Sequence, residues 1–320
     1  MTNASFTTVR NGDIDLRVAT LGSGPLILCI HGWPELWISW RHQMEHFARL
    51  GFTVAAMDVR GYGGSSKPTD IAAYRLSELC GDAAAVIDAL GEGQAIVYGH
   101  DWGAPIAWNT ARLHAAKVRA VTGLSVPYLP VGPIPSTDLW MQLYADRFFY
   151  QTYFQTPGVA EAEFGANTAK SLRMIFYSIS GNGAGLFLHE KPAGARFLDG
   201  LIDPDPFPSW MSAEELATYT EAIEAGGWHG PLNRYRAQGL DAAELGERPD
   251  PILTQPATFI AGELDAVRNF VPGLDLFSFA SESCADFRGS TIVPGAGHWV
   301  QQEAPAAVNA ALQSFVASVG

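Results

Sequence analysis

The pentapeptide Gly99-His100-Asp101-Trp102-Gly103 constrains the fold more than any other part of this 320-residue chain. Residues 95–98 before it form a short apolar run typical of a buried strand, and a run that favours a helix begins at Ala104. Glycines two residues to either side of Asp101 let a sharp strand–turn–helix connection pack closely. The free N–H groups at the start of the helix then favour an anion at the turn. The pattern predicts that Asp101 is a nucleophile.

An aspartate at this position selects a class of chemistry. A carboxylate that attacks a carbonyl group gives an anhydride, whereas one that attacks a saturated carbon gives an ester that water can then hydrolyse. Asp101 therefore predicts an sp3 electrophile with a leaving group, such as an epoxide or an alkyl halide. The plainer interpretation, in which Asp101 only caps a helix, is disfavoured by the motifs described below.

The first part of the chain alternates strand-like and helical segments. We predict strands at residues 13–21, 26–30, 52–57, 95–98 and 118–124, and helices at 38–50 and 76–90. Buried apolar strands that alternate with helices indicate an α/β fold with a mostly parallel sheet covered on both faces.

A change in the sequence pattern after residue 127 predicts an inserted unit. Four prolines lie between residues 127 and 135 and mark the exit of the chain from the sheet. Beyond them we predict helices at 139–154, 168–179 and 232–238, a long loop at 181–210, and a helix that opens with the capping box Ser212–Glu215 and ends at Gly226-Gly227. The alternation of strands and helices then resumes, with strands predicted at 258–261 and 291–293 and a helix at 304–316. The domains expected are a core of residues 1–127 and 249–320 and a helical cap of residues 128–248.

The charge of the chain bears on its partners. With 20 basic and 33 acidic side chains, the net charge is −13, which repels phosphate backbones and anionic lipids. We therefore expect neither nucleic acid nor a membrane as a partner. Three cysteines without disulfide or zinc spacing, and no secretory signal in residues 1–12, predict a cytoplasmic protein.

Six motifs, spread over the core and the cap, carry a resemblance to a known family. They are His31-Gly32-Trp33-Pro34, residues 58–65, the pentapeptide around Asp101, residues 150–161, residues 230–236 and Gly295-Ala296-Gly297-His298-Trp299. Together they resemble the epoxide hydrolase family of the α/β-hydrolase fold. The resemblance implies a mostly parallel eight-stranded sheet flanked by helices, with an inserted helical cap. It also implies conversion of an epoxide to a vicinal diol without a cofactor or a metal ion.

A histidine and a second aspartate complete the machinery that the resemblance implies. His298 follows the strand predicted at 291–293 in a glycine-rich loop, and it would take a proton from the water that attacks the Asp101 ester. Asp265 would orient the imidazole and stabilise its charged form. Glu263, two residues earlier, is a competitor that the family pattern disfavours.

Two cap tyrosines distinguish an epoxide from other electrophiles. The resemblance implies that Tyr150 and Tyr235 hydrogen-bond the epoxide oxygen and donate a proton as the ring opens. Tyr153 lies one helical turn beyond Tyr150 and is the alternative donor, and packing in the cap core is the plainer interpretation for all three.

Two tryptophans are expected beside the nucleophile. The backbone N–H groups of Trp33 and Trp102 would form an oxyanion hole, an effect worth about 2.7–4 kcal/mol per donor. The resemblance also implies a cis peptide bond between Trp33 and Pro34. The substrate pocket is predicted to contain Trp33, Trp102, Phe154, Gln151 and Trp299, which suggests a small apolar epoxide as the substrate.

Other interpretations remain open at this point. A dehalogenase on the same scaffold would use the same nucleophile, and a non-catalytic ligand receptor would use the same fold. The run His42-Gln43-Met44-Glu45-His46 fits an inverted zinc-protease pattern, although its place in a hydrolase-like core favours a polar helix face. A homodimer is compatible with the sequence.

Overall fold

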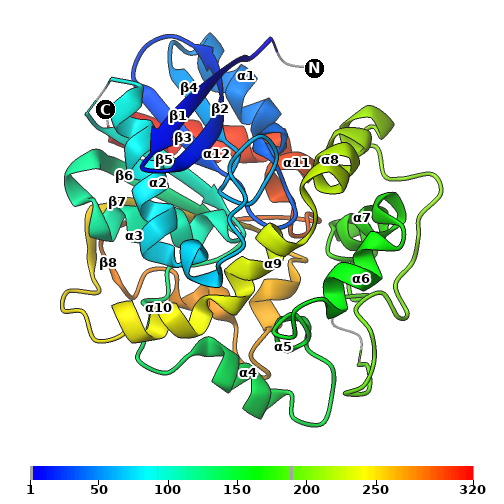
Figure 1. The fold of residues 1–320 in the computed structure, drawn as a ribbon. Coiled ribbons are helices and arrows are strands. Elements are labelled where there is room, and N and C mark those ends of the chain that lie inside the picture. Colours follow the sequence, from blue (N-terminus) through cyan, green and yellow to red (C-terminus); the bar gives the residue numbers. More distant parts are fainter. Residues whose placement is uncertain (1–2, 92, 188–189, 320) are drawn as a thin grey trace.

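The computed structural model describes residues 3–91, 93–187 and 190–319, and an eight-stranded sheet forms its centre (Figure 1). The strands are β1 (Ser5–Asn11), β2 (Ile14–Gly22), β3 (Leu26–Ile30), β4 (Thr53–Met57), β5 (Ala95–His100), β6 (Val118–Leu124), β7 (Leu253–Gly262) and β8 (Cys284–Val293). Their order is β1-β2-β4-β3-β5-β6-β7-β8. Strand β2 runs antiparallel to both of its neighbours, and all other pairs are parallel. The predicted mostly parallel sheet is confirmed.

Helices cover both faces of the sheet. They are α1 (Arg41–Arg49), α2 (Leu76–Ala89), α3 (Gly103–Leu113), α11 (Val300–Glu303) and α12 (Pro305–Ser318). Helix α2 packs against α3, and α1 packs against α12, with the two pairs on opposite faces of the sheet in Figure 1. Because β3 and β5 are covered on both sides, every residue of these two strands is buried.

Among the described residues, seven further helices lie between β6 and β7. They are α4 (Ser136–Leu143), α5 (Tyr150–Tyr153), α6 (Val159–Gly165), α7 (Thr168–Ser178), α8 (Ala213–Gly226), α9 (His229–Arg236) and α10 (Gln238–Leu245). In Figure 1 they extend beyond the sheet and its flanking helices on two sides, with α6, α7 and α8 on the right and α4, α5 and α10 below. The predicted capping box is confirmed, because Glu215 N–H donates to Ser212 Oγ at 3.2 Å and Ser212 N–H donates to Glu215 Oε2 at 2.7 Å.

Short 3-10 turns connect several of these elements. They are η1 (Trp37–Trp40), η2 (Ile71–Tyr74), η3 (Ala115–Lys117), η4 (Gly181–Gly183), η5 (Ala266–Asn269) and η6 (Leu276–Phe279). Turn η5 begins immediately after Asp265, whose side chain accepts the N–H of Val267 at 3.0 Å. This turn therefore orients the chain next to the predicted site.

One predicted helix is wrong, and strand β1, helix α6 and most of helix α10 have no predicted counterpart. The single helix expected at 139–154 is divided into α4 and α5, because the intervening chain pairs elsewhere: Arg147 forms a β-bridge with Pro192, and Phe148 N–H donates to Lys191 O at 2.9 Å. Strand β1 was not predicted, since six of its seven residues are not buried and show no alternation of apolar and polar side chains. Pairing with β2 creates it.

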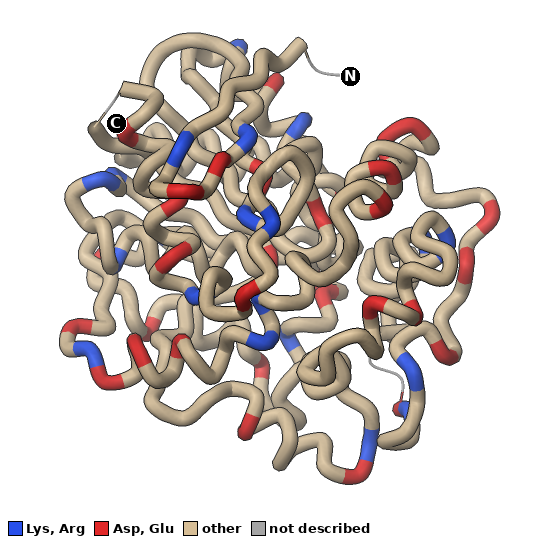
Figure 2. Tube along the Cα trace, in the orientation of Figure 1, with Lys and Arg blue, Asp and Glu red and all other residues tan. Residues whose placement is uncertain are grey.

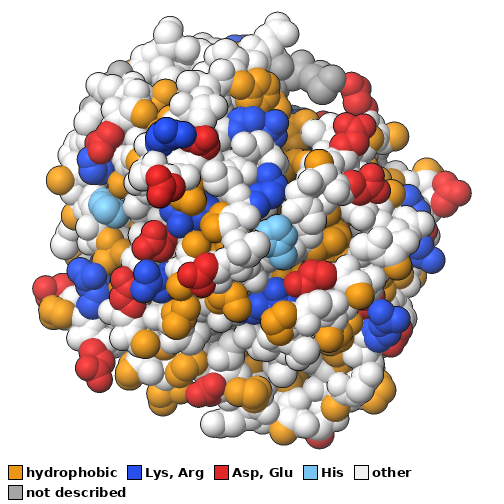
Figure 3. All heavy atoms as spheres, in the orientation of Figure 1, with side chains coloured by type: hydrophobic (Ala, Val, Ile, Leu, Met, Phe, Trp, Pro, Cys, Tyr) orange, Lys and Arg blue, Asp and Glu red, His pale blue; other side chains and the backbone are white. Residues whose placement is uncertain are grey.

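Charged side chains are distributed over the whole trace in Figure 2, with acidic and basic residues on both the sheet region and the inserted helices. On the face shown in Figure 3, the basic side chains are interspersed with acidic and apolar ones and form no continuous surface. No helix within the described ranges is long and apolar enough to span a bilayer.

Candidate active site

Asp101 occupies the turn that joins β5 to α3. Its φ is +50°, a left-handed conformation that an L side chain adopts at an energetic cost. A Cβ atom on Gly99 would lie 2.0 Å from the carbonyl oxygen of Gly103, and one on Gly103 would lie 2.0 Å from that of Ile30. Both glycines are therefore steric requirements of this turn, which agrees with the interpretation of the pentapeptide.

Two groups face the carboxylate of Asp101. Oδ1 accepts the backbone N–H of Trp33 at 2.7 Å, and Oδ2 lies 3.4 Å from Nε2 of His298. The Trp33 loop can approach because its neighbour is glycine: a Cβ on Gly32 would lie 2.4 Å from both Cβ and Oδ1 of Asp101. The Trp33–Pro34 peptide is cis, as the resemblance implied. Trp102 follows Asp101 directly and is the N-cap residue of α3.

His298 and Asp265 lie together although 33 residues separate them. Nδ1 of His298 lies 3.0 Å and 3.1 Å from the two carboxylate oxygens of Asp265, and both residues are buried. The competitor Glu263 is exposed and accepts the N–H of Gly295 at 3.0 Å instead. The imidazole therefore lies between two carboxylates, with Asp265 on one nitrogen and Asp101 on the other.

This arrangement shifts the pKa of both partners. Burial opposes the charged form of Asp101, but the hydrogen bond and the charge of His298, with the charge of His100, outweigh burial and lower the pKa of Asp101. Burial likewise opposes the charged form of His298, yet the charge of Asp265 and the contact with Asp101 raise its pKa well above 6.5. These shifts favour an ionised Asp101 beside a protonated His298.

Tyr150 and Tyr235 lie near each other on two cap helices, α5 and α9. Their ring centroids are 5.8 Å apart, and both rings are buried. Burial, followed by the charge of Asp101, raises the pKa of Tyr150 above its usual value, and burial with the neighbouring Tyr150 and Asp101 does the same for Tyr235. Both phenols therefore keep their protons at neutral pH. Tyr153 is directed elsewhere, because its hydroxyl donates to Glu163 at 2.7 Å.

A small cavity brings the predicted groups together. Its volume is about 20 Å³, enough for a reacting group alone, and its lining includes Asp101, His298, Tyr150 and Tyr235. Trp33 also lines it, as predicted. The remaining lining residues are Ile179, Phe187, Val267 and Phe270.

A larger, mostly apolar cavity of about 340 Å³ adjoins the small one. Asp101, Tyr150, Val267 and Phe270 line both. Two of the predicted pocket residues, Trp102 and Gln151, lie on its wall; the apolar part of the wall also includes Val126, Leu139, Trp140, Val271 and Leu276. This cavity can bury an apolar substituent next to the nucleophile.

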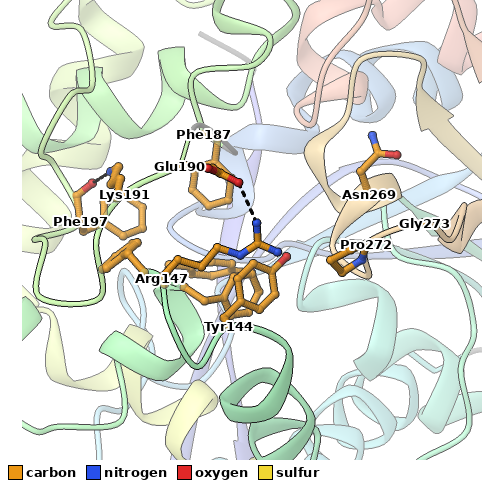
Figure 4. A pocket seen from close by; sticks show the side chains of 12 residues that line it. Tyr144, Arg147, Phe187, Glu190, Lys191, Phe197, Asn269, Pro272 and Gly273 are labelled. Carbon is orange, nitrogen blue, oxygen red and sulfur yellow. Dashed lines mark hydrogen bonds and ion pairs between the residues drawn. The ribbon is translucent and has the colours of Figure 1, made fainter.

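A third cavity, of about 300 Å³, lies on the other side of Tyr150 and Phe187. Figure 4 shows that its rim is more polar: Arg147 pairs with Glu190 at 3.0 Å, and Lys191 donates to the carbonyl oxygen of Phe197 at 2.5 Å. Tyr150 therefore borders all three cavities.

Two predicted pocket residues do not line these three cavities. Phe154 and Trp299 are completely buried. Phe154 packs behind the pocket against Tyr235, with ring centroids 4.9 Å apart, and the indole of Trp299 donates to the carbonyl oxygen of Phe176 at 2.8 Å. Their proximity in sequence to Tyr150 and His298 suggested the pocket, but their side chains point into the packed interior.

Sequence reasoning missed a buried polar network behind the nucleophile. His100 contacts Glu35, and the side-chain amides of Gln301 and Gln302 both donate to Glu35 Oε1 at 2.9 Å. Glu35 directly follows His31-Gly32-Trp33-Pro34, and His100 lies inside the pentapeptide around Asp101, so their closeness to two motifs was the available signal.

The histidine pair of the inverted zinc-protease pattern is part of α1. Nε2 of His46 lies 3.0 Å from Oε1 of Gln313, and His42 is half-buried. Within the described ranges, no group of three or more His, Cys, Asp or Glu side chains could hold a metal ion.

Comparison with known proteins agrees with this geometry. Residues 25–305 match the family model described as alpha/beta hydrolase fold. The chain is 37% identical over 312 residues to epoxide hydrolase A of Mycobacterium tuberculosis, with 96% of each chain covered. It is 33% identical to epoxide hydrolase 2 of Siraitia grosvenorii, with 99% of each covered.

Solved structures give the same result. An epoxide hydrolase from an endophytic Streptomyces superposes with a TM-score of 0.94 at 37% identity, covering 100% of this chain and 97% of that one. Epoxide hydrolase A from Mycobacterium thermoresistibile superposes with a TM-score of 0.90 at 38% identity, covering 98% of each. The chain therefore belongs to the epoxide hydrolase family of the α/β-hydrolase fold.

Proposed function

We propose that this protein converts an apolar epoxide and water to a vicinal diol through a covalent ester on Asp101. One observation carries the proposal: a carboxylate, an imidazole and two phenols, from four separate parts of the chain, line the same small cavity. Roles are assigned to these side chains by their chemistry and by the family resemblance. Residues 128–248, the helical cap, supply both phenols.

In the first step, Asp101 attacks one ring carbon while Tyr150 and Tyr235 hydrogen-bond the ring oxygen. A C–O bond forms to the carboxylate, the ring C–O bond breaks, and one phenol gives its proton to the oxygen. General acid assistance of this kind contributes about 10²–10⁴-fold. Because the pKa of each phenol is raised, the resulting phenolate is a strong base that is quickly reprotonated.

Ester formation prepares His298 for the second step. The negative charge of Asp101 helps to raise the pKa of His298 in the free protein. The ester does not carry this charge. The pKa of His298 therefore falls, and His298 can give its proton to the phenolate. Neutral His298 is then a general base, while Asp265 keeps its imidazole oriented.

In the second step, water gives one proton to His298 and its oxygen bonds to the ester carbonyl carbon. The N–H of Trp33, which already contacts Oδ1, would stabilise the oxyanion that develops there, together with the N–H of Trp102. The acyl C–O bond breaks, and the second proton of the water leaves with the diol. Asp101 is again ionised and His298 again protonated.

We infer from the larger cavity that the substrate carries one apolar substituent, which fits into its volume of about 340 Å³. A cytoplasmic location and the lack of a nucleic-acid or membrane partner remain predictions from the cysteines and from the net charge of −13. Assembly as a homodimer also stays a prediction, as does the absence of any required cofactor.

The experiment that tests the proposal is a single turnover of excess enzyme with styrene oxide in water labelled with the heavy oxygen isotope. The expected diol carries no label, because its new oxygen comes from Asp101, and a peptide containing Asp101 gains the label. A labelled diol with an unlabelled peptide would show direct attack by water. Halide release from bromoalkanes without any diol from epoxides would favour a dehalogenase, and binding of epoxides without product would favour a receptor.

A further inference from the structure

The loop that carries His298 is attached to one stretch of the cap, residues 176–181. The backbone N–H of His298 donates to the carbonyl oxygen of Ile179 at 2.9 Å. A Cβ atom on Gly297 would lie 2.3 Å from the nitrogen of Gly181, so the two backbones are in direct contact. The position of His298 therefore depends on the chain that leaves the C-terminus of α7.

Glu303 joins the same two segments through its carboxylate. Oε2 accepts the N–H of Gly181 in the cap at 2.7 Å and the N–H of Gly297 at 3.0 Å, while Oε1 accepts the N–H of Trp299 at 3.0 Å. Gly297 and Trp299 flank His298 on either side. Through these three hydrogen bonds one side chain holds both ends of this short loop against the cap.

We propose that Glu303 is a positioning residue for His298, one that clamps cap residues 176–181 to the histidine loop and so sets the geometry of water attack on the ester. The inference rests on the proposed function, in which His298 acts in ester hydrolysis. Glu303 acts only through backbone N–H groups. Tyr150 and Tyr235 lie on α5 and α9, which Glu303 does not bind, so we expect ring opening to depend on the clamp much less than ester hydrolysis does.

Two variants and a matched control separate this role from a general effect on folding. Glu303→Gln keeps the size of the side chain but replaces one acceptor oxygen by an amide that would face an N–H donor. Glu303→Asp keeps the charge and withdraws it by one methylene group. The control is Glu263→Gln, because Glu263 also accepts an N–H of the histidine loop, that of Gly295, but from an exposed position.

The experiment is a rapid-quench single turnover with styrene oxide, in which intact-protein mass spectrometry measures formation and breakdown of the ester. For Glu303→Gln we expect ester formation within about twofold of the wild-type rate. Breakdown of the ester should slow by about 10- to 100-fold, because a small misplacement of a catalytic group lowers the rate of its step by about this factor. Glu303→Asp should show the same split to a smaller degree, and Glu263→Gln should match the wild type in both steps.

Three outcomes would overturn the inference. Ester breakdown at the wild-type rate in both Glu303 variants would show that the clamp does not position His298. Equal slowing of both steps, together with a lower Tm, would show a structural role alone. An equal defect in Glu263→Gln would show that any carboxylate on this loop has the same effect. Wild-type enzyme that forms no ester would instead refute the proposed function, on which the inference rests.

Discussion

Nδ1 of His100 lies 2.7 Å from Oε2 of Glu35, and both side chains are completely buried. Nε2 of the same ring lies 2.8 Å from the carbonyl oxygen of His298. The carbonyl group only accepts hydrogen bonds, so Nε2 of His100 donates to it, while Nδ1 shares a hydrogen bond with the carboxyl group of Glu35. This pair links the Trp33 loop, the turn at Asp101 and the histidine loop.

Removal of Glu35 should therefore destabilise the protein strongly. For Glu35→Ala we expect a loss of about 3–5 kcal/mol in the free energy of unfolding, because Nδ1 of His100 and the side-chain amides of Gln301 and Gln302 are left buried without their partner. Urea denaturation measures this change. His46→Ala is the control, since His46 contacts Gln313 near the surface and should change stability by less than about 0.5 kcal/mol. Equal effects of the two substitutions would contradict a stabilising role for the buried hydrogen bonds of Glu35.

Loss of the general base should trap the covalent intermediate. In His298→Gln, Asp101 still opens the epoxide, but no imidazole takes the proton from water. The mass of the intact protein should therefore increase by the mass of the substrate and remain increased. Asp101→Asn, which lacks the nucleophile, should show no adduct. An unmodified His298→Gln protein after long incubation would argue against covalent catalysis.

The two phenols should act in ring opening and not in ester hydrolysis. We expect Tyr150→Phe and Tyr235→Phe each to slow ester formation by about 10²-fold or more, within the range known for general acids, and the double variant to lose turnover. Single-turnover kinetics measure the step directly. Tyr153→Phe should retain most activity, because its hydroxyl contacts Glu163 outside the small cavity. Full activity of the double variant would exclude the proposed acid.

The raised pKa of His298 predicts how stability depends on pH. Folding raises this pKa above 6.5, so the stabilising effect of the charged ring is complete below that value and is lost as the pH rises through the folded-state pKa. The difference in free energy of unfolding between wild type and His298→Gln should therefore shrink as the pH rises above about 6.5 and through the folded-state pKa of His298. Urea denaturation across this range measures it. A difference that grows with pH would reverse the assigned sign.

The close approach of Gly32 to Asp101 predicts a steric requirement. A Cβ at position 32 would lie 2.4 Å from Oδ1 of Asp101, so Gly32→Ala must displace the nucleophile or the loop that donates the Trp33 N–H. We expect kcat to fall by about 10²-fold or more. Gly132→Ala is the matched control, because a Cβ there would meet no atom within 4 Å. Steady-state kinetics of both variants, with circular dichroism to check folding, decide the point.

The amino-acid sequence by itself determined the central part of this protein. The turn at Asp101 can be predicted from the sequence because a strand, a helix and two glycines lie within about ten residues. Its geometry is therefore a local property of the chain. The alternation of apolar strands and helices likewise predicts the parallel sheet, since burial on both faces demands continuous apolar runs. The family pattern indicated Asp265 over Glu263, and the geometry agrees.

Tertiary structure alone decided the remainder. Strand β1 and the break between α4 and α5 arise from pairing with distant segments, which no local periodicity records. The same holds for the partners of Glu35 and Glu303, which are brought together only when the chain folds. Phe154 and Trp299 lie beside site residues in sequence yet point away from the cavities. A motif specifies a residue type at a turn, whereas the side chains that meet across the fold depend on packing.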